Sequence, residues 1–138
     1  MRTATPAAIQ RGRARDMPFT GNLLAESLRR EEPLDAAPLT VRRIRRSDDG
    51  DPSARQPLTW TFIEFEVPDD AVDAFGAAVT GALEPGPWYC DFRSDTETFV
   101  VFAGRAFRYP RGDRSARAEA EEHARSVGVP EAQIDWPI

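Results

Sequence analysis

The sequence contains no lysine, so all 18 of its basic residues are arginine, and they accompany 23 acidic residues. It also has a single cysteine, Cys90, and a single histidine, His123. A lone cysteine cannot close an internal disulfide, and it excludes a zinc site built from several cysteines. No apolar run has the length of a membrane span, and the arginine-rich start lacks the apolar core of a signal peptide. These absences predict a cytoplasmic protein without membrane contact, and no motif indicates a metal or a cofactor.

The 138 residues fit one domain, with 41% apolar and 30% charged residues. Charge is divided unevenly along the chain. Residues 1–46 hold 10 arginines and five acidic residues, whereas residues 47–138 hold eight arginines and 18 acidic residues. Residues 1–16 lack hydrophobic periodicity, which predicts a flexible basic tail followed by a single α+β domain over residues 17–138.

Periodicity and turn signals predict the elements of that domain. Strands are expected at 39–47, 58–67 and 88–93, and residues 98–102 and 105–109 should form a hairpin around Ala103 and Gly104. Helices are expected at 20–30, within 68–86 and at 113–127. On the strand at 58–67, Trp60 and Phe62 share the face of two glutamates, so we expect that face to be covered near its start.

This order of elements predicts an α+β fold with an antiparallel or mixed sheet of four to five strands and helices packed on one face. A ferredoxin-like arrangement is one form of that class. The final residues return as an extended segment whose Ile134 and Trp136 either join the core or complete the sheet.

The densest group of polar residues lies between Phe99 and Gly128. One interpretation is a hairpin and a surface helix, in which arginine stems cover apolar surface. The other is an anion or ligand site on the sheet. Its candidate residues are Arg93, Arg105, Arg108, Tyr109 and Asp91. The expected hairpin register puts Arg105 and Tyr109 on one face and Arg108 on the other, so we favour the first interpretation.

His123 borders the inward stripe of the last helix, and nothing near it in the sequence supplies a nucleophile or a metal set. We therefore expect boundary packing. Cys90 shares a strand face with Trp88 and Phe92, which predicts a buried and unreactive thiol.

The basic half of the chain suggests a nucleic-acid interface, because phosphate binding requires a gathered positive surface. Its candidate residues are Arg11, Arg13, Arg15, Arg42, Arg43, Arg45 and Arg46. Phe19 is the only aromatic residue in residues 1–46, and the acidic remainder would repel phosphate.

The sequence thus favours a non-enzymatic cytoplasmic interaction or regulatory protein that binds a protein partner through a charged surface. A homodimer formed through the edge strand near Val41 is a further form of that hypothesis. The alternatives are a nucleic-acid or ribosome-associated protein using the arginine-rich segment, and a small ligand-binding domain or enzyme with the anion site.

Overall fold

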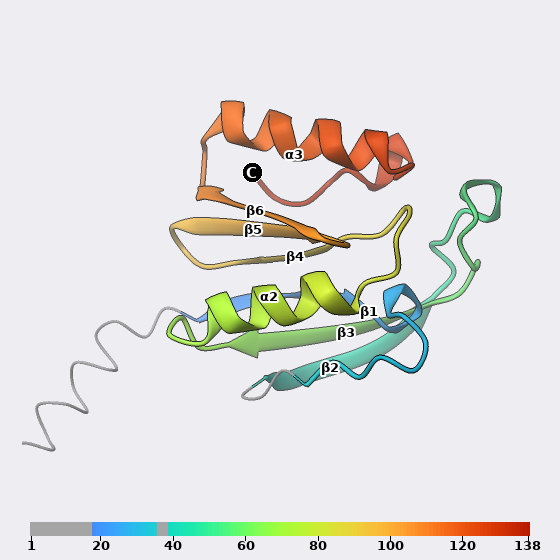
Figure 1. The fold of residues 1–138 in the computed structure, drawn as a ribbon, viewed down its shortest axis with the longest axis horizontal. Helices are drawn as coiled ribbons and strands as arrows, with labels where there is room; N and C mark the ends of the chain where they lie inside the picture. Colours follow the sequence, from blue (N-terminus) through green and yellow to red (C-terminus); the bar gives the residue numbers. More distant parts are fainter. Residues whose placement is uncertain (1–17, 36–38) are drawn as a thin grey trace, which may run out of the picture.

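A single antiparallel sheet organises the chain in the computed structural model, which describes residues 18–35 and 39–138 (Figure 1). Its strand order is β2-β3-β1-β4-β5-β6. The strands are β1 (Phe19–Leu24), β2 (Thr40–Ser47), β3 (Trp60–Val67), β4 (Cys90–Arg93), β5 (Glu97–Phe102) and β6 (Arg105–Pro110). The helices are α2 (Val72–Ala82) and α3 (Arg114–Ser126), with short 3-10 turns η1 (Ala25–Ser27), η2 (Pro52–Ala54) and η3 (Glu131–Gln133). The expected α+β class is confirmed.

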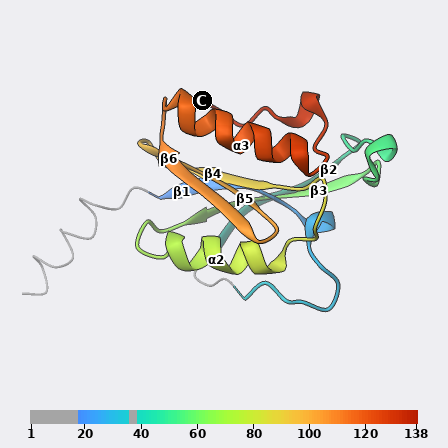
Figure 2. The same cartoon turned by 45° about the horizontal axis from the view of Figure 1, so that its top comes forward.

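The two helices lie on opposite faces of the sheet (Figure 2). Helix α2 covers a core of phenylalanines, in which Phe92 stacks on Phe99 with 4.8 Å between ring centroids. Helix α3 presents Ala120 and Ala124 to the other face, where small side chains allow close approach. Strand β5 is buried on both faces, which explains its continuous apolar run.

The expectation of helices on one face is therefore wrong. Phe99 and Val101 belong to the α2 core, whereas Val100 and Phe102 belong to the α3 core, so each face of the sheet is covered by one helix. The ferredoxin-like arrangement is not confirmed, because it needs both helices on the same face.

The expected count of four to five strands is also wrong, because the segment expected to be a helix from Thr20 is the central strand β1. Phe19 and Leu23 lie four residues apart, a spacing that fits one face of a helix and one face of a strand equally well. Between them, Gly21 faces Phe92 across the β1–β4 pair, where β1 inserts between β3 and β4. The helical turn that follows is only η1.

Local signals gave correct boundaries elsewhere. The hairpin register is as expected, with Phe102 opposite Arg105 and Phe99 opposite Arg108. Asp113 caps α3 by accepting a hydrogen bond from the Ala116 amide, and Gly128 has the positive φ of 94° expected after the helix. Trp136 joins the α3 core and donates to the Tyr109 hydroxyl at 2.8 Å. The proposed tail at 1–16 lies outside the described residues.

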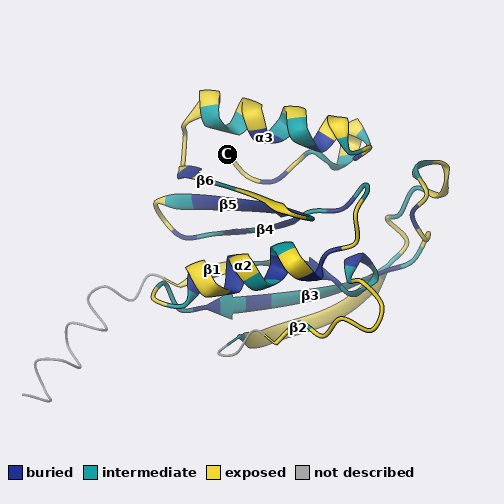
Figure 3. Ribbon diagram, in the orientation of Figure 1, coloured by how far each residue is buried: buried dark blue, intermediate teal, exposed yellow. Residues whose placement is uncertain are grey.

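Burial is uneven across the sheet (Figure 3). Strand β2 forms one edge and is exposed over nearly its whole length, whereas β4 and β5 are largely buried. Neither helix in the described part of the chain is long and apolar enough to cross a membrane.

The Gly21 position predicts a contrast between two glycines. A Cβ atom on Gly21 would lie 2.1 Å from the backbone oxygen of Asp91 and 2.6 Å from Cβ of Phe92. Gly81, in α2, has nothing within 4 Å of the same position. Gly21→Ala should therefore lower the free energy of unfolding by about 2 kcal/mol or more, through strain at the centre of the sheet. Gly81→Ala should raise it by up to about 1 kcal/mol, because alanine favours a helix. Denaturant titrations measure both, and shifts of the same sign would contradict this account of β1.

Candidate functional site

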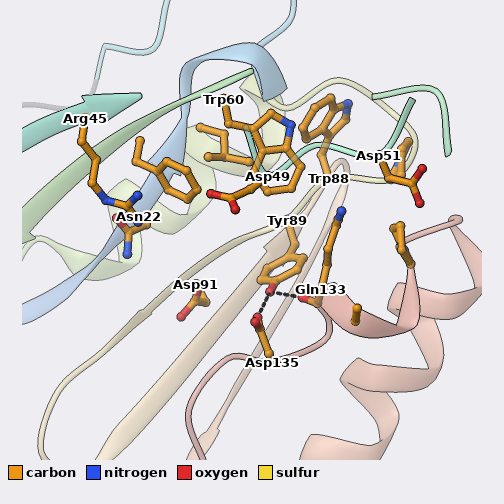
Figure 4. Close-up of a pocket in the computed structure, with 15 residues that line it drawn as sticks. Asn22, Arg45, Asp49, Asp51, Trp60, Trp88, Tyr89, Asp91, Gln133 and Asp135 are labelled. Atoms are coloured by element: carbon orange, nitrogen blue, oxygen red, sulfur yellow. Dashed lines mark hydrogen bonds between the residues drawn. The ribbon is translucent and has the colours of Figure 1, made fainter. Parts of the chain in front are cut away.

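A cavity of about 590 Å³ opens on the α3 face of the sheet, beside the part that α3 covers (Figure 4). Its floor comes from β3, β1 and β4. Its walls come from the loop after β2, the segment before β4, and residues 130–135 near the C-terminus. The site is therefore assembled from segments that are far apart in the sequence.

Aromatic side chains line much of this cavity. Trp60 and Phe62 project from β3, and the Trp60 ring lies 5.9 Å from that of Trp88. The expectation that this face of β3 is covered near its start is confirmed, since Leu24 and Trp88 pack there. Tyr89 completes the aromatic lining, and its hydroxyl donates to the Gln133 backbone oxygen at 2.5 Å.

Two glutamine amides join the walls of the cavity. Gln56 donates to the Gln133 side-chain oxygen at 2.9 Å, and Gln133 donates back to Gln56 at 2.8 Å. Gln56 also donates to the Pro87 oxygen and accepts from the Asp51 amide. This reciprocal pair links the loop after β2 to the C-terminal segment.

Four carboxylates border the cavity, and they differ in how far they are already satisfied. Asp51 accepts from the Ser53 amide and hydroxyl, so it is occupied in capping η2. Asp135 lies 3.3 Å from the Tyr89 hydroxyl. Both Asp49 and Asp91 line the cavity, and within the described residues neither carboxylate accepts a hydrogen bond from another residue.

One cation, Arg45, lines the cavity. Its guanidinium lies over the Phe62 ring at 4.0 Å and its Nε is 3.5 Å from a Glu64 oxygen. The lining therefore has an excess of negative charge and already holds one guanidinium against an aromatic ring.

Burial raises the pKa of Asp91 to about 6. The positive charge of Arg93 opposes this shift, and the negative charge of Asp135 adds to it. Burial also raises the pKa of Tyr89, so its hydroxyl stays protonated and remains a donor. Around neutral pH the cavity thus combines a fixed hydroxyl donor with the carboxylate of Asp91, whose ionisation burial disfavours.

The residues predicted as an anion site are not gathered in one place. Arg108 lies on the α2 face, where it pairs with Glu97 at 2.9 Å and with Asp73, and covers the Phe99 ring. Arg105 lies on the opposite face over the Phe107 ring.

The other members of that set also have separate surroundings. Tyr109 is buried and accepts from Trp136. Arg93 borders a shallow hollow with Asp95 and Arg111, and only Asp91 lines the acidic cavity.

The candidate basic arm is described in part. Arg11, Arg13 and Arg15 lie outside the described residues. Arg42, Arg43, Arg45 and Arg46 all lie on β2, where Arg42 pairs with Glu66 at 2.7 Å and Arg43 with Glu64 at 3.0 Å. These arginines form a strand edge whose charge is partly neutralised by its neighbour β3.

The lone histidine and cysteine are placed as expected. His123 packs on Phe102 with 4.6 Å between ring centroids and on Phe107 at 5.7 Å. Cys90 is fully buried, and burial raises the pKa of its thiol. Within residues 18–35 and 39–138 no three His, Cys, Asp or Glu side chains are placed to hold a metal ion.

The fold and the cavity define an α+β domain with one antiparallel sheet and a candidate binding pocket. No model of a protein family matches the sequence, and no curated protein or solved structure matches it either. The sequence did not predict most of the pocket residues. Trp60 and Phe62, which share the glutamate face of β3, indicated only that apolar side chains cover that face.

Asp91 predicts a pH-dependent stability. Its pKa is about 6 in the folded chain against an ordinary value of 3.8, so folding takes up a proton between these values. The protonated carboxyl group of Asp91 therefore makes its full contribution to the free energy of unfolding below about pH 4, and that contribution is lost as the pH rises through 6. Asp91→Asn should match the wild type near pH 4 and exceed it at pH 8 by on the order of 2 kcal/mol. Denaturant titrations across this range test it, with the exposed Asp70→Asn as control. Parallel stability curves for wild type and Asp91→Asn would contradict the assignment.

Proposed function

We propose that this protein is a non-enzymatic interaction protein that binds a protein partner by receiving a cationic side chain in the acidic cavity. The observation that carries the proposal is the composition of the lining: four carboxylates and one arginine around aromatic walls in a hollow of about 590 Å³. Aromatic faces and carboxylates are the two groups that attract a partly desolvated cation.

Arginine is the side chain that the cavity suits best. Its planar guanidinium stacks on aromatic rings and forms paired hydrogen bonds with a carboxylate, whereas an ammonium acts as a point charge. Arg45 already makes such a stack on Phe62 at one end of the cavity. The oxygens of Asp49 and Asp91 can accept the hydrogen bonds of an incoming guanidinium.

The remaining hypotheses have less support. An anion would meet the negative potential of four carboxylates in this cavity. A nucleic acid would compete with Glu64 and Glu66 for the arginines of β2. A free, buried Cys90 fits a reducing compartment, which supports the expectation of a cytoplasmic protein.

A matched pair of peptides tests the proposed function. A short peptide centred on arginine should quench or shift the fluorescence of Trp60 and Trp88, and its citrulline counterpart, which has the same shape without the charge, should bind about tenfold more weakly or not at all. Affinity for the arginine peptide should rise with pH through about 6, as Asp91 becomes ionised. Isothermal titration calorimetry gives the affinities.

Two variants locate the binding. Asp49→Asn and Asp91→Asn should each weaken the arginine peptide about fivefold or more, whereas Asp70→Asn, an equal change of charge outside the cavity, should leave its affinity unchanged. Equal binding of the arginine and citrulline peptides, or equal effects of the three variants, would refute the proposal.

A further inference from the structure

Strand β2 offers a second surface, which shares only Arg45 with the cavity. It forms one end of the sheet order, and no strand in residues 18–35 or 39–138 pairs with its outer edge. An unpaired edge of this kind presents backbone N–H and C=O groups that can hydrogen-bond to another extended chain. Seven of its eight residues are exposed.

The two faces of β2 differ in chemistry. On the α2 side, the large hydrophobic residues Val41 and Ile44 are 49% and 61% exposed, and Arg46, opposite Thr61, shares this side. On the other side, Arg42, Arg43 and Arg45 project toward the glutamates of β3. The pattern follows from the register, which places Ile44 opposite Ile63 and Arg45 opposite Phe62.

A β-bulge between Val41 and Arg43 strengthens this asymmetry. Because of it, the consecutive residues Arg42 and Arg43 both reach carboxylates of β3, on Glu66 and Glu64 respectively. Beyond the bulge, residues 43–47 pair regularly with β3, so this half of the outer edge is straight enough to continue the sheet.

The strand retains a surplus of positive charge after its internal ion pairs. Three of its arginines, Arg42, Arg43 and Arg45, face two glutamates of β3, and the side chains of Arg42 and Arg43 remain 59% and 66% exposed. Exposed ion pairs of this type contribute little to stability, so an added carboxylate can share these guanidinium groups without a large penalty.

The pairing of β2 with β3 on its inner edge shows which side-chain pattern β2 can pair with. Its neighbour β3 places Glu64 and Glu66 beside the arginines and places Ile63 and Phe65 beside Ile44 and Val41. An acidic residue alternating with an apolar one is thus the pattern that pairs with β2 in this fold. The same pattern on the outer side would meet the same side chains.

We infer that the outer edge of β2 binds an extended, acidic segment of a partner protein, whose carboxylates alternate with apolar residues and which adds a seventh strand to the sheet. Backbone hydrogen bonds supply affinity and the arginines supply selectivity, as in other recognition by strand addition. The carboxylates lie over Arg42 and Arg43, and the apolar residues cover Val41 and Ile44.

Charge argues against a second copy of this chain as the occupant. Antiparallel pairing of β2 with another β2 would bring eight arginines together around the contact, and like charges directly opposite one another destabilise a strand pair. Edge charges commonly protect sheets from self-association. Here the same charges exclude a basic copy and admit an acidic strand.

Two synthetic peptides of one length test the inference. In the first, glutamate alternates with valine, and in the second, lysine replaces every glutamate. The glutamate peptide should bind the full-length protein and slow amide hydrogen exchange at the outward-facing N–H groups of β2, and its affinity should fall several-fold between about 0.05 and 0.3 M salt. The lysine peptide should bind at least about tenfold more weakly.

Variants separate charge from apolar contact. Arg42→Gln with Arg43→Gln should weaken the glutamate peptide about tenfold, and Ile44→Thr, which keeps the tendency to form a strand, about threefold. Arg105→Gln and Leu58→Thr are the matched controls, since both residues are exposed outside β2 and should leave binding unchanged. Circular dichroism confirms that each variant is folded.

The outcomes are decisive in both directions. Selective, salt-sensitive binding of the glutamate peptide with protection confined to β2 supports the inference. Absence of binding, equal binding of both peptides, or a wild-type dimer in sedimentation that Ile44→Thr dissociates would overturn it. Because arginine peptides probe the cavity and glutamate peptides probe β2, failure of one proposal leaves the other intact.

Discussion

The aromatic core under α2 depends on Phe92, whose ring contacts those of Phe19, Phe65, Phe75 and Phe99. These partners come from β1, β3, α2 and β5, so one side chain links three strands and a helix to β4. Side chains alternate along a strand, and a fixed Phe92 therefore forces its neighbour Asp91 to the opposite face. The position of the carboxylate in the cavity is thus a consequence of packing on the far side of the sheet.

The two candidate surfaces have opposite charge and meet at Arg45. This residue belongs to β2, yet its guanidinium stacks on Phe62 at the rim of the cavity. A chain with an acidic hollow beside a basic edge can recognise a partner segment that itself carries both signs of charge. Attraction of opposite charges at two adjacent places fixes the orientation of a bound segment more firmly than either place alone.

Features set by neighbouring residues were predictable from the sequence. The turn at Ala103 and Gly104 determined the hairpin register, and Asp113 and Gly128 marked the ends of α3. Features set by distant contacts were not. The strand β1 depends on insertion between β3 and β4, which the spacing of Phe19 and Leu23 leaves undecided. The cavity unites Asp49, Trp60, Trp88 and Gln133, and the sequence offered only the unexpected aromatics on β3 as a sign of it.

The two hydrogen bonds between the side-chain amides of Gln56 and Gln133 hold two walls of the cavity together, and they require both side chains to remain amides. Each amide donates to the other, which is a geometry that needs an N–H group on both partners. Deamidation of Gln133 to glutamate would remove its donor and leave the Gln56 oxygen with the Asp51 amide alone. Gln56 would still donate to the new carboxylate, so deamidation at this position would remove one of the two hydrogen bonds that join the C-terminal wall to the loop after β2.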